Sequence, residues 1–259
     1  MIKFFRKIRQ KLLSENKFSK YLIYAIGEIV LVIIGILLAL QINNRNTERN
    51  EKATFESNLQ FVIEDLEQDK TDLLKLKKER QQVISKTEFI LQAVKEQKML
   101  SSHEIYNNSE IMLWKSFDIN NNGHERILSS NLYEAINFQP IRKKIRAYIL
   151  FYQQIKDLEK KLNESVEEME IEMSKDGSIL EVYEYGNLIN SVSELDGTTK
   201  KELENYVIDF NKSYINNQPM LSLFQRGKLI TKGLIQMYDH LIELGEDLQL
   251  EIENYLNKN

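Results

Sequence analysis

The side chains best suited to metal binding or acid–base catalysis are three histidines and a large number of carboxylates. His103 is followed by Glu104, but no second histidine stands at the spacing of a zinc-protease helix. A carboxylate-bridged di-metal bundle requires two Glu-x-x-His pairs, whereas Leu100, Asn121 and Met237 stand three residues before the histidines. Neither kind of metal site is therefore predicted.

The sequence also lacks the motifs of enzymes that use a nucleophilic side chain or a bound cofactor. The chain has no cysteine, which excludes disulfides, thiolate nucleophiles and cysteine-ligated metals. It contains neither the G-x-S-x-G motif nor a P-loop, and no G-x-G-x-x-G follows a strand-like run. Pairs of carboxylates are abundant, but their spacing is that of salt bridges on helix surfaces. We therefore expect a protein that is not an enzyme and that binds no cofactor.

Two single residues are the candidate contact sites, Trp114 and Glu28. Trp114 is the only tryptophan and stands close to Met112 and Phe117, which favours a core anchor; the wall of a ligand pocket is the alternative. Glu28 is the only charge in an otherwise apolar run. Its carboxylate either reaches back to the membrane interface, is protonated, or pairs with a polar group on a neighbouring span.

The run around Glu28, residues 21–42, is the element that would place it in a membrane. Its 22 residues reach roughly 33 Å as a helix, and a bilayer core needs about 20 apolar residues. No small-residue cleavage site follows the run, which favours an uncleaved signal anchor. Within it, Gly35 and Ala39 stand four positions apart, a spacing that lets two helices approach closely.

Charge predicts the orientation of this span. Residues 1–20 carry seven basic side chains and one acidic side chain, and basic flanks stay on the cytoplasmic side. We therefore expect a cytoplasmic N-terminus, a span in the inner membrane and a periplasmic body. Residues 1–42 sum to +5, so with a formal net charge of −4 the remainder carries −9. The acidic body argues against nucleic-acid binding, while the basic head suits lipid headgroups.

The body is expected to consist of long amphipathic helices. Alternating steps of four and three residues pick out three series that are mostly apolar or aromatic, as a buried helix face requires. Nine of twelve members are apolar or aromatic over residues 55–94, nine of ten over 141–173, and seven of eight over 230–255. Asp69 and Arg80 interrupt the first series. They either set the helix register or lie at a bundle edge that faces solvent.

Short signals mark where these helices begin and end. Ser101 starts a capping pattern before a short helix that is expected to end near Phe117. Pro140 fits the first turn of the next long helix, whereas Pro219 is expected to stop or kink the helix that starts near Thr199. Residues 179–197 are the expected loop or short-helix insertion.

These patterns predict an all-α protein, in which an N-terminal transmembrane helix is followed by an extended antiparallel helical bundle with coiled-coil-like seams. Three parts are expected in chain order. They are a basic cytoplasmic amphipathic segment (residues 1–20), a transmembrane signal anchor (21–42) and an extracytoplasmic helical bundle domain (43–259).

Several phrases resemble those of a known membrane protein family. They are MIKFFRKIR at the start, GEIVLV followed by IGILLALQINN in the anchor, and LSSNL at residues 128–132. Over residues 1–50, and more loosely across the helical body, the chain is similar to an uncharacterised Bacteroidota single-pass family, catalogued as a domain of unknown function. The resemblance implies a single-pass anchor, a helical body and a recurring phrase around Glu28, and it brings no activity or site. Arg45 stands where the family pattern suggests tryptophan, and Asn131 where it suggests glycine.

Three functional hypotheses follow. The leading one is a membrane-anchored helical interaction module, a scaffold or accessory subunit, which contacts the lipid bilayer and either a second copy or a partner membrane protein. The second is a ligand-sensing periplasmic bundle with Trp114 and tyrosines around a pocket between helices. It would need a separate transducer, because only about twenty residues lie inside the cell. An unrecognised enzyme ranks last.

Overall fold

Every regular element that the structure describes is helical, which confirms the all-α prediction. The predictions for the basic head and for most of residues 179–197 lie outside the described residues. The chain divides into two compact units, Met1–Ser57 and Asn58–Asn259. The residues that the computed structural model describes are 18–175, 177, 179–180, 183, 186–187 and 217–258.

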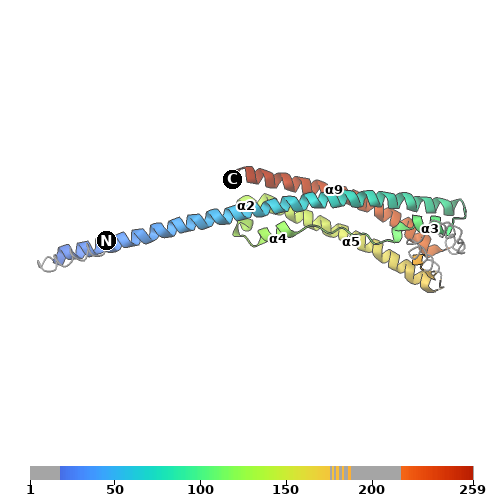
Figure 1. Ribbon diagram of the computed structural model, residues 1–259, viewed down its shortest axis with the longest axis horizontal. Helices are drawn as coiled ribbons and strands as arrows, with labels where there is room; N and C mark the ends of the chain where they lie inside the picture. The colour runs from blue at the N-terminus through green and yellow to red at the C-terminus, as the bar shows by residue number, and fades with distance from the viewer. Residues whose placement is uncertain are drawn as a thin grey trace, which may run out of the picture. The chain divides into compact units, whose positions relative to one another are not determined.

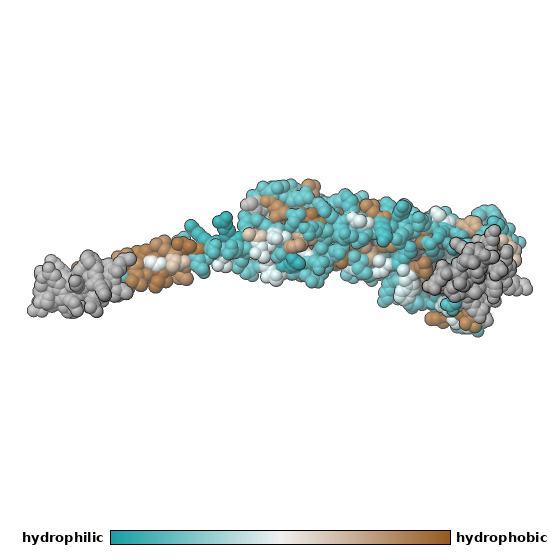
Figure 2. Space-filling model, viewed as in Figure 1, coloured by the Kyte–Doolittle hydropathy of each residue, from teal (hydrophilic) through white to brown (hydrophobic). Residues whose placement is uncertain are grey.

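The first unit contains the N-terminal part of helix α2, which runs from Phe18 to Lys95. From Leu22 to Ile42 its exposed side chains are mostly leucine, isoleucine and valine, and Figure 2 shows them as a continuous apolar band. By length and composition this helix could cross a membrane. Water is an unfavourable environment for such a surface, so this part of the helix needs lipid or protein around it.

The second unit is organised around three long helices. They are residues 58–95 of α2, α5 (Gln139–Lys175) and α9 (Gln218–Lys258), and they lie side by side in Figure 1. At 1.5 Å per residue each of the three is roughly 55–60 Å long. Because their lengths match, each can bury one face along most of its extent.

The apolar series predicted for α2 and α5 are their buried faces. All ten members of the α5 series are buried, and only Leu76 and Val94 of the α2 series are partly exposed. Each series repeats every 3.5 residues on average, so one stripe of each helix faces the core. In a large part of the core, members of these two series are joined by side chains of α9. This part contains Val83, Ile90, Val166, Met169, Met173, Met220, Leu223 and Phe224.

The series predicted for α9 is only partly correct. Leu234, Leu241 and Leu248 are buried, but the other five members are partly exposed. A search for large apolar residues misses the true face because small and polar residues complete it. The missed buried positions include Gly227, Thr231, Tyr238 and Gly245.

Helix α9 runs antiparallel to α2. Near the start of the second unit, Lys70 pairs with Glu246 at 2.7 Å. Further along α2, Glu88 pairs with Lys232 at 3.3 Å. Residue numbers therefore rise along one helix as they fall along the other.

Helices α2 and α5, in contrast, run parallel to each other. The Tyr148 hydroxyl donates to Asp69 at 2.7 Å, and further along both helices the Arg80 guanidinium meets Glu159 at 3.4 Å. The bundle therefore differs from a fully antiparallel one. A parallel pair requires a connection that returns the chain along the length of the helices.

Residues 96–138 form this return connection, and Figure 1 shows its middle part running beside the long helices. Residues 113–121 have no helical structure. We call residues 113–123 the crossover segment. The short helices of the connection are α3 (Ser102–Asn108), η1 (Glu110–Met112), α4 (Asn122–Leu128), η2 (Asn131–Glu134) and η3 (Ile136–Phe138).

The predicted cap of α3 is confirmed, whereas its predicted end is wrong. Ser101 Oγ accepts from the Glu104 N–H at 3.2 Å, and Glu104 Oε2 accepts from the Ser101 N–H at 2.8 Å. The helix ends at Asn108, well before Phe117. The side chains of Asn108 and Ser109 donate to carbonyl oxygens of the preceding turn at 2.7 Å, and such bonds compete with helix continuation.

Both prolines lie in the first turn of a long helix. Pro140 follows the first residue of α5, as predicted, and Pro219 follows the first residue of α9. Asn217 caps α9, because its Oδ1 accepts from the Met220 N–H at 3.1 Å. Pro219 therefore lies in the first turn of α9. The helix that it is predicted to stop or kink would precede it, outside the described residues.

Gly123 permits a close approach between the connection and the backbone of α2. A Cβ atom at this position would lie 2.3 Å from Val62 N and 2.6 Å from Phe61 C. These are backbone atoms of a helix, which cannot move aside as a flexible side chain can. Glycine is therefore required at the start of α4.

The Gly123→Ala substitution is expected to lower the free energy of unfolding by about 1–3 kcal/mol, because it overpacks against backbone. Gly233→Ala is the matched control. Its Cβ would meet only Leu158 Cδ2, at 3.7 Å, and alanine is favoured over glycine in a helix by about 1 kcal/mol. Urea unfolding of the full chain in detergent, followed by circular dichroism, measures both. Equal effects of the two substitutions would contradict the packing at Gly123.

Candidate functional site

The crossover segment lies against the long helices without a neighbouring strand among the described residues. Buried backbone N–H and C=O groups need partners, and a helix or sheet would normally supply them. Two carboxylates of α2 do so at one end of the segment. Asp69 Oδ1 accepts from the Asn120 N–H at 2.7 Å, and Asp65 Oδ2 accepts from the Gly123 N–H at 2.6 Å.

A second group of polar side chains holds the other end of the segment. The Arg80 guanidinium donates to the Lys115 carbonyl at 2.8 Å. Glu159 Oε2 accepts from the Phe117 N–H at 3.1 Å. Because Arg80 belongs to α2 and Glu159 to α5, the segment is hydrogen-bonded to two helices at once.

Tyr238 of α9 completes this group. Its hydroxyl donates to Glu159 Oε1 at 2.6 Å and accepts from Arg80 Nε at 2.9 Å. Arg80 and Glu159 are each 2 % exposed and Tyr238 is 0 % exposed. A buried charge pair is tolerated only when its remaining donors and acceptors are satisfied, and these bonds provide that. The three long helices are thus joined at one level by a hydrogen-bonded charge pair.

The burial of Asp69 and Arg80 decides between the two interpretations of the polar positions on α2. Asp69 is 1 % exposed and Arg80 is 2 % exposed, so the interpretation that places them at a solvent-facing edge is wrong. Each is directed at backbone of the crossover segment and at a side chain of another long helix. They fix which part of the connection lies opposite which part of α2.

Burial also shifts proton affinities in this region. It raises the pKa of Asp69, although the Asn120 N–H and the Tyr148 hydroxyl lower it in part. Burial likewise raises the pKa of Tyr148 and of Tyr238. Both phenols therefore remain neutral donors. Their protons are directed at protein carboxylates, so the arrangement suits structural hydrogen bonding rather than proton transfer to a substrate.

An open groove of about 420 Å³ lies between the connection and the first half of α5. The connection contributes His124, Leu128 and Tyr133 to its wall. Three cationic side chains of α5 line it, and no carboxylate does. Burial lowers the pKa of His124, so this side chain is neutral near pH 7. We call this feature the basic groove; the α5 residues that line it are Gln139, Arg142, Lys143, Ile145, Arg146, Ile149 and Leu150.

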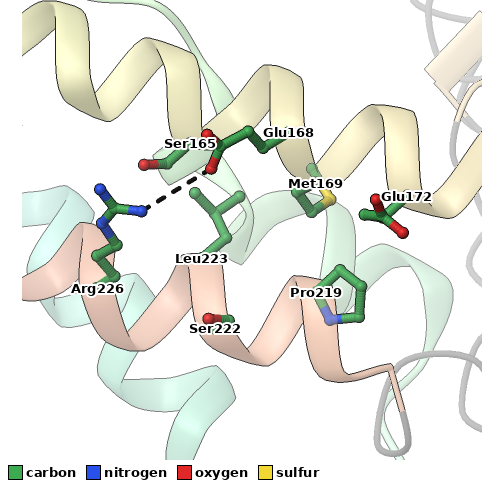
Figure 3. A pocket seen from close by; sticks show the side chains of 8 residues that line it. All are labelled: Ser165, Glu168, Met169, Glu172, Pro219, Ser222, Leu223 and Arg226. Atoms are coloured by element: carbon green, nitrogen blue, oxygen red, sulfur yellow. Dashed lines mark ion pairs between the residues drawn. The ribbon is translucent and has the colours of Figure 1, made fainter.

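A smaller hollow of about 190 Å³ lies between α5 and α9. Figure 3 shows Glu168 and Arg226 facing each other there, with 3.8 Å between Oε2 and Nη1. The cation is therefore already paired within the hollow. Its other lining side chains are Ser165, Met169, Glu172, Pro219, Ser222 and Leu223.

Trp114 lies on the surface, so its predicted role as a core anchor is wrong. It is 63 % exposed, and its neighbour Leu113 is 61 % exposed. The bonds at Lys115 and Phe117 fix the extended backbone so that Phe117, which is 3 % exposed, takes the core position. The Phe117 ring packs edge-on against Tyr152, with ring centroids 6.0 Å apart.

The remaining predicted contact residues belong to the apolar part of α2. Glu28 is partly exposed, and Ala39 is exposed. Nothing lies within 4 Å of a Cβ built on Gly35. The small surface at Gly35 and Ala39 is therefore open, and its role in helix pairing stays a prediction.

Sequence reasoning missed the partners of the crossover segment. The patterns do not single out Asp65, the expected α9 series omits Tyr238, and Glu159 is the one polar member of the α5 series. The available signal was a set of polar residues on otherwise apolar stripes, since a buried polar side chain implies a partner. Nothing in the spacing alone indicates that the partner is backbone from another segment.

No group of three or more histidine, aspartate or glutamate side chains is arranged as a metal site in the part of the chain that the structure describes. Comparison with protein families, with curated proteins and with solved structures found no match to this chain.

Removal of Glu159 is expected to destabilise the bundle strongly. The Glu159→Leu variant leaves Arg80 buried without its counter-charge, which typically lowers the free energy of unfolding by about 3–5 kcal/mol. The double variant with Arg80→Met should recover much of that loss. Asp247→Ala removes an exposed partner of Lys144 and should change stability by no more than about 1 kcal/mol. Additive losses in the double variant, measured by urea unfolding, would contradict the coupling.

The raised pKa of Asp69 predicts a pH dependence of stability. Its folded pKa exceeds the unfolded value of 3.8, so its contribution to stability is present below pH 3.8 and is lost as the pH rises through the folded value. The difference in unfolding free energy between wild type and Asp69→Asn should therefore fall as the pH rises through this window.

Asp118→Asn provides a control of opposite sign. The Lys156 side chain lowers the pKa of Asp118, so the contribution of this carboxylate is lost as the pH falls. Urea unfolding between pH 3 and pH 7 measures both variants against wild type. If the unfolding free energy of wild type minus that of Asp69→Asn rises with pH, burial does not raise the pKa of Asp69 as proposed.

Proposed function

We propose that this protein is a membrane-anchored helical interaction module, a scaffold or accessory subunit rather than an enzyme. The observation that carries the proposal is the crossover segment. Its backbone is held by buried charged side chains, while Leu113 and Trp114 are turned outward. Buried hydrogen bonds thus fix the backbone of this segment, although the side chains of Leu113 and Trp114 are not part of the core.

An exposed tryptophan on a fixed backbone is well suited to protein recognition. Tryptophan is enriched among the residues that dominate binding energy at protein interfaces. Its large ring buries much apolar area and loses few rotatable bonds. Because the backbone at Lys115 and Phe117 is already ordered by Arg80 and Glu159, binding would not require the segment to become ordered first.

The apolar part of α2 supports attachment to a membrane. We propose a single inner-membrane span with the N-terminus in the cytoplasm and the body in the periplasm, from the excess of basic residues before the span. The resemblance to the Bacteroidota single-pass family agrees with a single span. A close approach of two spans at Gly35 and Ala39 would make a second copy the partner within the membrane.

A ligand-sensing bundle is the second candidate. The basic groove favours it, because it is of the size typical of small-molecule sites. The arrangement of pocket residues differs from the expected one: Trp114 does not line this groove, whereas Tyr133 does. With this topology sensing would still need a separate transducer.

A photo-crosslinking amino acid at position 114, in the full chain in native membranes, tests the interaction proposal. We expect a crosslinked protein partner from position 114, and none from the same amino acid at Glu167, an exposed position on α5. A product that contains only this chain would identify a second copy as the partner. Equal crosslinking from both positions, or none from position 114, would contradict the proposal. A reporter fused to the C-terminus checks the topology and should be active only outside the cytoplasm.

A further inference from the structure

The basic groove contains two cations without a partner. Lys143 and Arg146 are exposed, and neither has an ion-pair partner within the described residues. Their neighbour Lys144 points elsewhere and pairs with Asp247 and Glu251. The chain outside residues 1–42 carries a net charge of −9, yet the groove that these two cations line contains no carboxylate. An anionic ligand would supply the missing counter-charge.

The third cation of the groove is held in place by the connection. The Arg142 side chain pairs with Glu134 and donates to the Tyr133 carbonyl at 3.1 Å. Its guanidinium lies 5.8 Å from the centre of the Tyr133 ring. Arg142 therefore forms part of the wall, and Lys143 and Arg146 remain available to a ligand.

The rest of the groove is apolar. Leu128 and Leu150, which line it, are 50 % and 54 % exposed. Ile149 lies beside them in the wall. Covering these side chains would remove apolar surface from water, which is favourable. The groove thus presents cationic and apolar surface together.

We propose that the basic groove binds an anionic amphiphile, in which a carboxylate or phosphate group is joined to an acyl chain. Lys143 and Arg146 contact the anionic head, and Leu128 and Leu150 contact the chain. A soluble fatty acid and an anionic phospholipid of the bilayer share this chemistry. The inference is independent of any protein partner at Trp114, so it can fail while the interaction proposal stands.

The absence of native cysteine allows a site-specific test. Ile136 is 82 % exposed and lies in η3, between the groove residues Tyr133 and Gln139. The Ile136→Cys variant of the full chain, labelled with an environment-sensitive dye and held in phosphatidylcholine nanodiscs, is titrated with laurate. Uncharged 1-lauroylglycerol and inorganic phosphate are titrated in parallel. Laurate is expected to bind at least tenfold more tightly than either.

Charge-matched variants in the labelled background separate the groove from general charge effects. Lys143→Gln with Arg146→Gln should weaken laurate binding at least tenfold. Lys160→Gln with Lys161→Gln removes the same charge from exposed positions further along α5 and should change binding less than twofold. Laurate partitions into the disc equally in the presence of either double variant, so a difference in their laurate binding is due to the groove.

The two sources of the ligand are distinguished by changing the disc. In phosphatidylglycerol discs, a dye signal without added laurate, lost in the Lys143→Gln and Arg146→Gln variant, supports occupation from the bilayer. A signal only on addition of laurate supports occupation from solution. Three results would each overturn the proposal. The first is equal binding of laurate by the two double variants. The second is equal binding of laurate and 1-lauroylglycerol, and the third is binding of inorganic phosphate as tight as that of laurate.

Discussion

An extended backbone that runs between helices must have its hydrogen bonds satisfied by something other than a sheet. In this bundle the crossover segment is that backbone, and charged side chains of the long helices supply the partners. Asp65 and Asp69 accept from N–H groups at one end, and Arg80 and Glu159 hold a carbonyl and an N–H at the other. Most of the polar residues on the buried stripes of α2 and α5 follow from this single requirement.

The same requirement explains what is exposed. In an extended segment, successive side chains point in opposite directions. Because Phe117 is buried and the backbone near it is hydrogen-bonded to the helices, Trp114, three positions before it, points away from the core. The surface that we propose for recognition is therefore set by the bonds behind it. Its conformation depends on residues that a partner would never touch.

The long helices could be predicted because their buried stripes repeat at a helical period over many turns. The α5 stripe was predicted at every position, whereas the α9 stripe was misplaced where Gly227, Gly245 and Tyr238 replace large aliphatic residues. The position of Trp114 could not be predicted from local pattern. It depends on a backbone path that is fixed by Arg80 and Glu159, which are distant in sequence. The basic groove was likewise hidden, because a run of basic residues on a helix normally faces solvent, and only the packing of α4 and η2 against α5 makes it concave.

The parallel pairing of α2 and α5 has a consequence for how the chain acquires its structure. The contacts Asp69–Tyr148 and Arg80–Glu159 each join residues 79 positions apart, so this pair cannot assemble as a local helical hairpin. Loop closure over such distances makes folding slow. The apolar stripe of α2 is synthesised before α5 exists to cover it, so during this interval it is exposed apolar surface that is prone to aggregation.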